Sequence, residues 1–291
     1  MGLFDNLDDT TGESHVQHEI VKAPFGWPGG KSKSLKQILP HLQYRKAYVE
    51  PFGGSFAVGL ARVPSTVEVY NDRYGGICDF YRVLRDPTLL PLLCTRLELT
   101  VYSREEFVWS KTTWENVTDP VERAARWYYM IMTSFGCLGR NYGRVLAFKN
   151  SQFANKIHEH IHGFDRIHQR LATVQIENMD WFYYIRDYDS PDTVFYIDPP
   201  YIDASPGIYD HEMETKDYMR LIDAIFSAKG FCALSGYADN PIFDNRPWDD
   251  KITWDAFVSI ETVTNTERNS RASLGTANER GTNKECLWIK Y

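Results

Sequence analysis

The chain alternates between short runs rich in β-branched and aromatic residues and segments in which apolar residues recur every three or four positions. The first pattern is typical of strands in a sheet, and the second of helices that bury one face. The predicted strands are 47–50, 67–72, 174–181, 193–198, 232–237 and 284–291. The predicted helices are 34–39, 56–61, 104–109, 120–132 and 217–229. Strands that alternate with helices predict an α/β fold with a mostly parallel sheet.

One long segment departs from this alternation. From about residue 97 to residue 167 the pattern is helical, and Pro120 stands at a plausible first turn of its longest helix. The first residues of the chain are polar, acidic and without periodicity, which is typical of a mobile tail. We therefore expect a flexible acidic tail at 1–20, an α/β domain built from 21–95 and 170–291, and an inserted helical subdomain at 96–169.

The strand at 193–197 carries the most informative residues of the chain. It is uncharged, and Pro199 and Pro200 must end it, so Asp198 stands at its carboxyl end, where open α/β sheets bind ligands. Because proline has no N–H, the two proline carbonyls and the Asp198 carboxylate form a rim of acceptors, which suits a substrate amino group. Tyr201 offers a flat face on which a flipped-out base would stack. The alternative is an ordinary Pro-Pro turn after a strand.

Two glycine turns and an acid indicate a nucleoside cofactor. The loop at 25–31 ends in Lys31 just before a predicted helix, a combination that suits a carboxylate or phosphate, although it lacks the spacing of a P-loop. The turn at 50–54 lies between a strand and a helix, where such folds hold a nucleoside. Asp72 ends the next strand, and its carboxylate is placed to accept hydrogen bonds from both hydroxyls of a ribose. A plain turn at Lys31 and a helix cap at Asp72 are the alternatives.

A glycine-rich, basic and aromatic stretch follows the longest helix, at 134–144. Its Arg140 and Asn141 belong to the residue types that pair bidentately with guanine and adenine edges. Overall the chain carries a net charge of −7, but its first twenty residues hold five acids and no Lys or Arg, so the remainder carries only −2. Six basic residues and two acids fall within 139–170. This local positive charge fits a DNA-contacting patch, and it also fits a solvated helical face.

Other features narrow the class of protein. No apolar run of membrane-spanning length and no secretory signal is found, so we expect a cytoplasmic protein. The five cysteines are scattered and free of any Cys-x-x-Cys pair, which argues against a disulfide framework or a zinc knuckle, and we expect no metal. None of them follows a proline, which argues against a catalytic cysteine that would attack a ring carbon of a base.

The motifs occur in the order of a known family. Asp-Pro-Pro-Tyr at 198–201 resembles the catalytic signature of the Dam-like (D12 class, α group) adenine-N6 DNA methyltransferases, and Trp-Pro-Gly-Gly-Lys at 27–31 resembles the box that opens that family. Glu-Pro-Phe-Gly-Gly at 50–54 resembles a third motif, but Phe56 replaces its usual last glycine. Residues 134–144 resemble part of the family's target-recognition element.

The resemblance implies a role for individual residues. The catalytic residues would be Asp198, Pro199, Pro200 and Tyr201. The residues that bind S-adenosylmethionine would be Trp27, Lys31, Glu50, Phe52, Gly54, Asp72, Asp180 and Asp198. The residues that contact DNA would be Arg140, Asn141, Arg144, Arg268 and Arg271.

The fold and activity implied by the resemblance are those of a Rossmann-like, S-adenosylmethionine-dependent methyltransferase with a helical target-recognition subdomain. Such an enzyme would methylate the exocyclic amine of an adenine flipped out of double-stranded DNA at a specific site. Two alternatives stay open: an N4-cytosine DNA methyltransferase, which would use the same rim of acceptors, and a DNA-binding relative without catalysis. Neither the recognition sequence nor the oligomeric state can be predicted from these residues.

Overall fold

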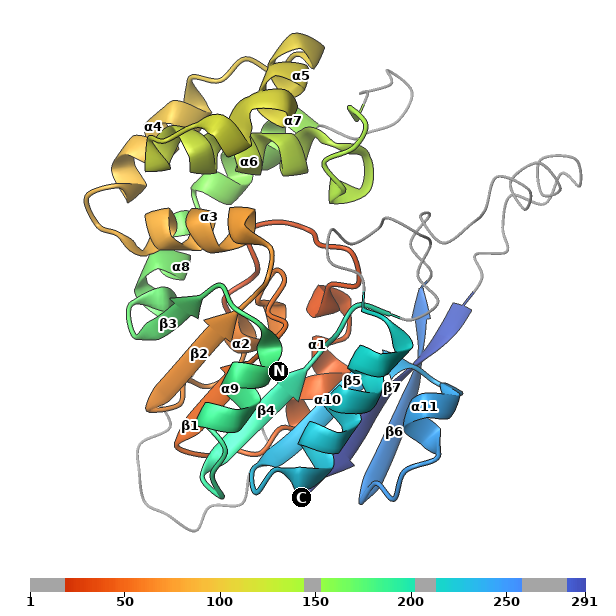
Figure 1. Ribbon diagram of the computed structural model, residues 1–291. Helices are drawn as coiled ribbons and strands as arrows, with labels where there is room; N and C mark the ends of the chain where they lie inside the picture. The colour runs from red at the N-terminus through yellow and green to blue at the C-terminus, as the bar shows by residue number, and fades with distance from the viewer. Residues whose placement is uncertain (1–18, 144–152, 202–212, 258–281) are drawn as a thin grey trace, which may run out of the picture.

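The computed structural model describes residues 19–143, 153–201, 213–257 and 282–291. At its centre is a seven-stranded sheet with the strand order β3-β2-β1-β4-β5-β7-β6 (Figure 1). The strands are β1 (Ala47–Glu50), β2 (Val67–Asn71), β3 (Val174–Glu177), β4 (Thr193–Ile197), β5 (Phe231–Tyr237), β6 (Asp250–Phe257) and β7 (Thr282–Lys290). The first five positions in this order are parallel, whereas β7 runs antiparallel to both β5 and β6.

The strand order reverses between β1 and β4, which are hydrogen-bonded neighbours. At such a switch point the connections leave in opposite directions and open a crevice beyond the carboxyl ends of the strands. The prediction of a mostly parallel, Rossmann-like α/β sheet is confirmed. Asp198 follows β4 directly, and the turn at 50–54 follows β1, so both predicted motifs meet at this crevice.

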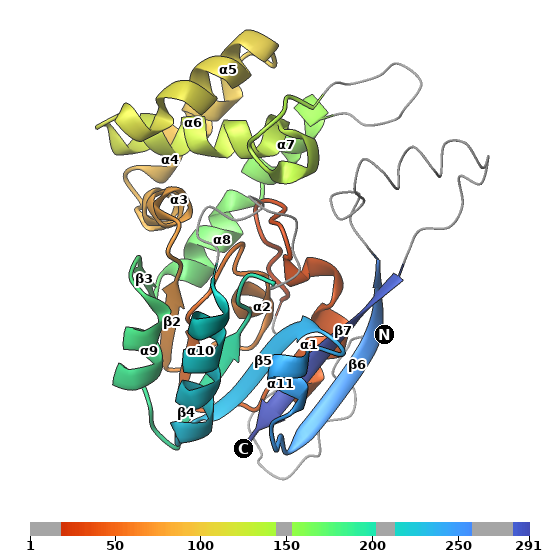
Figure 2. The ribbon, with the colours of Figure 1, turned by 45° about the vertical axis from the view of Figure 1, so that its right-hand side comes forward.

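Helices cover both faces of the sheet (Figure 2). They are α1 (Leu35–Ile38), α2 (Ala57–Ala61), α3 (Gly75–Arg85), α8 (Phe164–Leu171), α9 (Trp181–Asp187), α10 (Thr215–Ser227) and α11 (Pro241–Asp244). Because successive side chains of a strand point to opposite faces, Tyr48 joins the apolar cluster under α2, α3 and α8, whereas Val49 joins the cluster under α9 and α10. The central strands are buried on both faces, which accounts for their nearly continuous apolar sequence.

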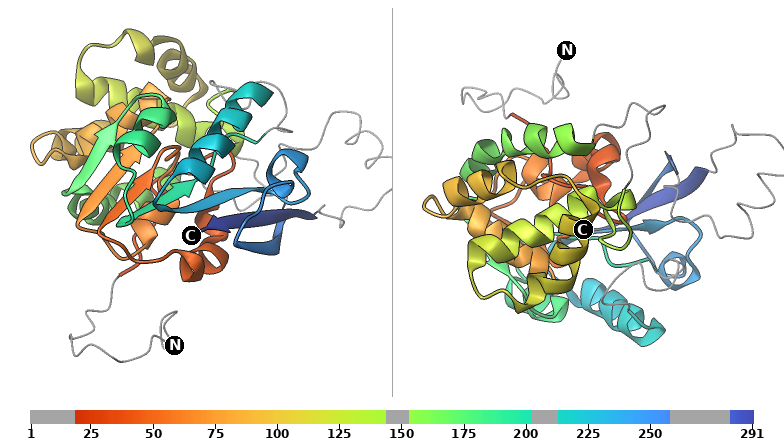
Figure 3. Two further views of the ribbon diagram at one scale, coloured as in Figure 1. Left: turned by 60° about the horizontal axis from the view of Figure 1, so that its bottom comes forward. Right: turned by 90° about the horizontal axis from the view of Figure 1, so that it is seen from above.

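Four further helices lie beyond the carboxyl ends of the strands, over the β1, β2 and β3 side of the sheet (Figures 1 and 3). They are α4 (Leu90–Glu98), α5 (Arg104–Thr113), α6 (Pro120–Thr133) and α7 (Phe153–Ile161). Asp119 caps α6 by accepting a hydrogen bond from the Glu122 N–H, with Pro120 in the first turn as expected. The limits predicted for a target-recognition subdomain, 96–169, stay a prediction.

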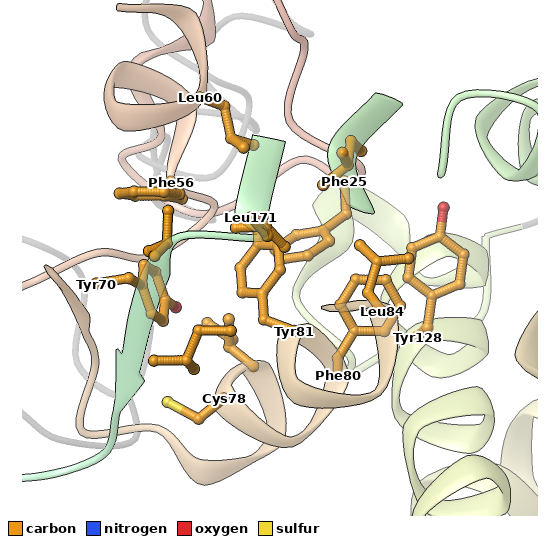
Figure 4. Packing of buried hydrophobic residues seen from close by; sticks show 14 of the residues in the cluster. Phe25, Phe56, Leu60, Tyr70, Cys78, Phe80, Tyr81, Leu84, Tyr128 and Leu171 are labelled. Carbon is orange, nitrogen blue, oxygen red and sulfur yellow. The ribbon is translucent and has the colours of Figure 1, made fainter. Parts of the chain in front are cut away.

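Aromatic packing joins this helical layer to the sheet domain (Figure 4). Tyr128 of α6 stacks on Phe80 of α3, with ring centroids 4.8 Å apart and planes 5° apart. Phe25, from the N-terminal loop, packs edge-on against Phe80 at 5.7 Å. The fully buried rings fix the helices over the crevice at the carboxyl ends of the strands.

Three elements differ from the sequence-based expectation. The strand predicted at 174–181 ends at Glu177, because Asp180 accepts a hydrogen bond from the Phe182 N–H and begins α9 at Trp181. Strand β6 was not predicted. The closing strand, predicted at 284–291, is β7 and begins earlier, at Thr282, and it lies between β5 and β6.

Candidate active site

A cavity of about 350 Å³ lies at the carboxyl ends of β1, β2 and β4. It is lined by the residues predicted for catalysis and for the cofactor, namely Trp27, Lys31, Glu50, Phe52, Gly54, Asp72, Asp180, Asp198, Pro199, Pro200 and Tyr201. Arg140, from the predicted recognition stretch, also lines it. Residues from four distant parts of the chain therefore meet around one space.

Asp198 is held by two donors at the mouth of this cavity. The Lys31 ammonium donates to both carboxylate oxygens at 2.7 Å and to the Gly29 carbonyl at 2.6 Å, which uses all three of its hydrogens. The Ser235 hydroxyl donates to Asp198 Oδ1 at 2.7 Å and accepts from the Tyr196 hydroxyl at 3.2 Å. Both side chains line the cavity, but that of Lys31 is 2% exposed and that of Asp198 17%, so the carboxylate is the more accessible of the two.

The charge of Lys31 is stabilised where it lies. Burial alone would lower the pKa of Lys31, but the attraction of Asp198, the influence of Tyr196 and Glu285 and the hydrogen bond to Asp198 together outweigh it, so the pKa of the ammonium is raised above its usual value. The expected rim of acceptors is therefore not made of acceptors alone, because a cation is bonded to its carboxylate. The alternative of a plain turn with an exposed lysine is wrong.

The aromatic residue of the signature lies beside the same cation. The ring of Tyr201 has the Lys31 ammonium 4.9 Å from its centroid, and Tyr237 of β5 packs edge-on against it at 4.4 Å. The carbonyl of Pro200 accepts a hydrogen bond from the Tyr218 hydroxyl of α10. The Asp-Pro-Pro-Tyr segment is thus tied to both β5 and α10.

The turn after β1 is organised by Asp72. One carboxylate oxygen accepts from the Gly54 N–H and the other from the Tyr74 N–H, both at 2.8 Å. Behind it, the buried Asn71 donates to the Pro51 carbonyl at 2.9 Å and accepts from the Met179 N–H at 2.9 Å, which joins the β1 turn to the loop after β3. These bonds set the positions of the loops that line the cavity.

Phe56 occupies the position at which the family motif usually has glycine. Its backbone is in the left-handed region, with φ of 53° and ψ of 29°. Residues other than glycine adopt this conformation only at a cost in free energy. The ring is fully buried and meets Tyr70 edge-on at 5.1 Å. Gly59 makes room for it, since a Cβ at that position would lie 2.1 Å from the ring. Burial of the phenyl group thus offsets the backbone strain.

Glu50, at the end of β1, is a buried acid that lines the cavity. Burial raises the pKa of Glu50 to about 8, although the hydrogen bond from the Tyr48 hydroxyl opposes this rise. Among the described residues Glu50 has no ion-pair partner. The cavity therefore contains a carboxyl group without a cation bonded to it.

Two pairs of aromatic side chains line the cavity. Trp27 packs at 5.6 Å from Tyr74, with the rings tilted by 34°. Phe52 stacks on Trp181 at 6.0 Å, next to the half-buried Asp180 that caps α9. A flat heterocycle bound here would have aromatic rings to pack against.

The predicted recognition stretch forms a tight, hydrogen-bonded turn. Ser134 and Tyr142 form an isolated antiparallel bridge, and the Phe135 N–H donates to the Asn141 carbonyl at 2.8 Å. Arg140 and Asn141 are exposed, and Lys111 of α5 donates to the Arg140 carbonyl at 2.8 Å. The other residues predicted to contact DNA lie outside the described residues, and they are Arg144, Arg268 and Arg271.

Sequence reasoning did not identify several residues that build the site. Ser235 and Tyr196 hold Asp198 from behind, and Asn71 links two of the cavity loops. The position of Ser235 within Leu-Ser-Gly-Tyr at the end of a strand was the available signal. No signal pointed to Asn71, because its partners are backbone groups far away in sequence.

The sheet order and the cavity at its switch point define the chain as a Rossmann-like α/β protein with a ligand site at the carboxyl ends of its strands. A family model described as D12 class N6 adenine-specific DNA methyltransferase matches residues 27–264. The chain belongs to this family and is a DNA adenine-N6 methyltransferase, as its motifs predicted. The family implies S-adenosylmethionine as the methyl donor and DNA as the substrate.

Two further comparisons add little to this assignment. A search of curated proteins finds no match. Among solved structures, the chain resembles the "rRNA methyltransferase aviRa from Streptomyces viridochromogenes" with a TM-score of 0.40 and 9% identity, over 91% of this chain and 85% of that one.

Within the described residues, no helix is long and apolar enough to cross a membrane. The same residues contain no group of three or more His, Cys, Asp or Glu side chains that would hold a metal ion.

Proposed function

We propose that this enzyme binds S-adenosylmethionine in the cavity and transfers its methyl group to N6 of an adenine flipped out of double-stranded DNA. The observation that carries the proposal is the position of Asp198, a half-buried carboxylate held by Lys31 and Ser235 at the mouth of a cavity with further acids. S-adenosylmethionine, when bound, supplies an electrophilic methyl group on a positively charged sulfur.

The cavity suits that donor in shape and charge. Asp72, whose carboxylate is fixed by two backbone N–H groups at the end of β2, would accept hydrogen bonds from the ribose hydroxyls. Trp27 and Phe52 belong to the aromatic walls that would cover the adenine ring of the donor. Burial raises the pKa of Glu50 to about 8, and the positive charge of a bound donor would favour its ionised form, so the two charges would stabilise each other. Tests of these roles must measure donor binding itself.

Asp198 and the Pro199 carbonyl would accept hydrogen bonds from the adenine amino group. The lone pair of that amine is delocalised into the ring, and two acceptors would draw its N–H groups out of the plane and free the lone pair for in-line attack. Both oxygens of Asp198 accept hydrogen bonds from Lys31, so Asp198 acts first as an acceptor. After transfer, the proton released from the amine would pass to Asp198 or through it to solvent.

DNA would approach from the side of the helical layer. Tyr201 would stack on the flipped base, because its ring lies next to the acceptor rim. Arg140 is exposed and also lines the cavity, so its turn suits a contact with DNA beside the flipped base. Residues 96–169, which include Arg144, are proposed to recognise the target together with Arg268 and Arg271.

Digestion of methylated DNA to nucleosides, followed by mass analysis of the modified base, tests this proposal. N6-methyladenine is the expected product, since a purine covers more of the Tyr201 ring than a pyrimidine does. N4-methylcytosine as the main product would overturn the base assignment. A non-catalytic relative would give neither base and would release no heat when titrated with S-adenosylmethionine.

A further inference from the structure

The bond between Lys31 and Asp198 presents a physical problem for the proposed reaction. Both oxygens of Asp198 accept from the ammonium, and one also accepts from Ser235. An adenine amino group that binds this carboxylate must therefore compete with a charged donor, which makes stronger hydrogen bonds than a neutral amine. Lys31 is almost fully buried, so water cannot replace a lost partner. The ammonium needs a second acceptor nearby.

Glu285 of β7 is such an acceptor. The sheet register pairs it with Tyr237 of β5, two residues after the Ser235 that holds Asp198, and alternate residues of a strand face the same side. It accepts a hydrogen bond from Ser34 at 3.2 Å, and Ser34 follows Lys31 by one turn of the same segment. Glu285 therefore faces the region of Lys31 from the strand beside β5.

The charges around Glu285 are consistent with this position. Burial raises the pKa of Glu285 above its usual value, the positive charge of Lys31 lowers it and the negative charge of Asp198 raises it. Trp254 of β6 donates to Ser34 at 3.3 Å and pairs with Glu285 in the sheet. Tyr196 of β4 and Tyr201 are the other titratable groups near Lys31 among the described residues. One cation thus lies within the influence of two carboxyl groups.

We infer that Glu285 is a positioning residue that takes over the Lys31 ammonium when the substrate amine binds to Asp198. The inference rests on the proposed function, because the arriving amine displaces the ammonium. No covalent bond is made or broken in this step, and only hydrogen bonds are exchanged. The lysine turns from one carboxylate to the other, so that Asp198 is freed for the amine while the buried cation stays paired.

The test replaces the arriving amine by a substitution. In Asp198→Asn the carboxylate is gone, so Lys31 should turn to Glu285. The pKa of Glu285 is measured by a carbon-13 NMR titration of the carboxyl groups, and its signal is assigned by comparison with the Glu285→Gln variant. The change in this pKa that Lys31→Met causes is then compared between two backgrounds, one with and one without Asp198→Asn. In the Asp198→Asn background, Lys31→Met should raise the Glu285 pKa by about one unit or more. In the unsubstituted background the rise should be clearly smaller.

Equal rises in the two backgrounds, or none, would overturn the inference. Lys31→Gln, which has no charge but keeps a polar end, repeats the comparison if Lys31→Met does not fold. Comparing the rises in the two backgrounds cancels the direct influence of Asp198 on Glu285. The titration needs no DNA and no methyl donor, so it decides the inference even if the wild-type protein methylates nothing, an outcome that would contradict only the proposed function.

Kinetics provide a second reading. Glu285→Gln should lower kcat about tenfold or more while the affinity for S-adenosylmethionine stays within about twofold, since the substitution acts on Asp198 and not on the donor. Ser34→Ala, which removes the hydrogen bond to Glu285 but keeps the carboxylate, should lower kcat much less. Equal losses in the two variants would point to a structural role for this corner and would overturn the positioning role.

Discussion

Two groups of charged residues in this protein are built from similar pairs but differ in how fully they are closed. In the first, Glu68 of β2 is fully buried and accepts from Arg170 of α8, with Nη2 at 2.8 Å, and from Arg62 at 3.4 Å. In the second, Asp198 accepts from Lys31 but remains open to a cavity. Salt bridges occur in both, so a salt bridge alone does not distinguish structure from function.

The difference lies in which lone pairs are used. The Ser65 N–H adds a further hydrogen bond to Glu68, so this carboxylate has neither space nor spare acceptors for a ligand. Asp198 accepts hydrogen bonds from Lys31 and Ser235 and still lines the cavity, with 17% of its side chain exposed. A satisfied, sealed ion pair holds elements together, whereas a half-open pair keeps a charge ready for a ligand. Glu50 combines the two features, because it is buried like Glu68 and lines the cavity like Asp198.

The largest effect on stability is expected in the sealed group. Arg170→Met leaves Glu68 buried with one cation fewer and should lower the free energy of unfolding by about 3–5 kcal/mol. Denaturant unfolding measures it. Lys46→Met is the matched control, because the Lys46–Asp192 pair is exposed and should contribute about 1 kcal/mol at most. A loss below 1 kcal/mol in Arg170→Met would remove the distinction between the two groups.

The next effect concerns Glu50 and depends on pH. Burial raises the pKa of Glu50 to about 8 in the folded protein, so the folded state holds a proton that the unfolded chain releases above about pH 4.5. The wild type should therefore lose stability relative to Glu50→Gln as the pH rises from about 5 to 8, by up to about 1.4 kcal/mol per pH unit. Thermal unfolding at several pH values measures this difference. A constant difference would mean that Glu50 is ionised throughout.

A smaller effect is expected at the ribose site. Asp72→Asn keeps an acceptor but loses the charge, and it should weaken the binding of S-adenosylmethionine by about 1.5–3 kcal/mol without changing the affinity for DNA. Calorimetry with the donor and a DNA-binding assay measure the two affinities. Unchanged donor binding together with weaker DNA binding would show that the first part of the chain has another role.

The smallest effect is expected outside the cavity, at Arg140 and Asn141. If Arg140 contacts a phosphate, Arg140→Ala should weaken all DNA sequences alike and lower the salt slope by about one. If either residue reads a base, its alanine variant should cost about 1–3 kcal/mol on the cognate site and relax preference there. Wild-type affinity and selectivity in both variants would place this turn outside the interface.

The sequence predicted the parts of the molecule that depend on local pattern. Strand β4 ends just before Asp198, Pro199 and Pro200, as the prolines require. The acids at the carboxyl ends of β1, β2 and β4 meet because parallel strands present these ends at one edge of the sheet. The hydrogen bonds between Lys31 and Asp198 were not predictable, since 167 residues separate them and no periodic pattern relates them. The position of β7 between β5 and β6 likewise depends on long-range pairing.

Phe56 marks the limit between these two kinds of prediction. Its departure from the family motif was visible in the sequence, but the reason was not. The left-handed backbone explains why glycine is usual there, and the contacts of the ring with Tyr70 and the space at Gly59 explain why phenylalanine is accepted. The local preference for glycine is not met at this position, and packing against Tyr70 of β2 together with the space at Gly59 of α2 compensates for it.

The central claim, that Asp198 is the acceptor for the substrate amine, is tested most directly by single-turnover methyl transfer in Asp198→Ala alongside calorimetry with S-adenosylmethionine. The proposed mechanism predicts a rate at least about 10²-fold below that of the wild type, because a preorganised electrostatic contact is lost, with donor binding largely retained. A rate above about 1% of wild type, with the donor still bound, would contradict the role assigned to this carboxylate.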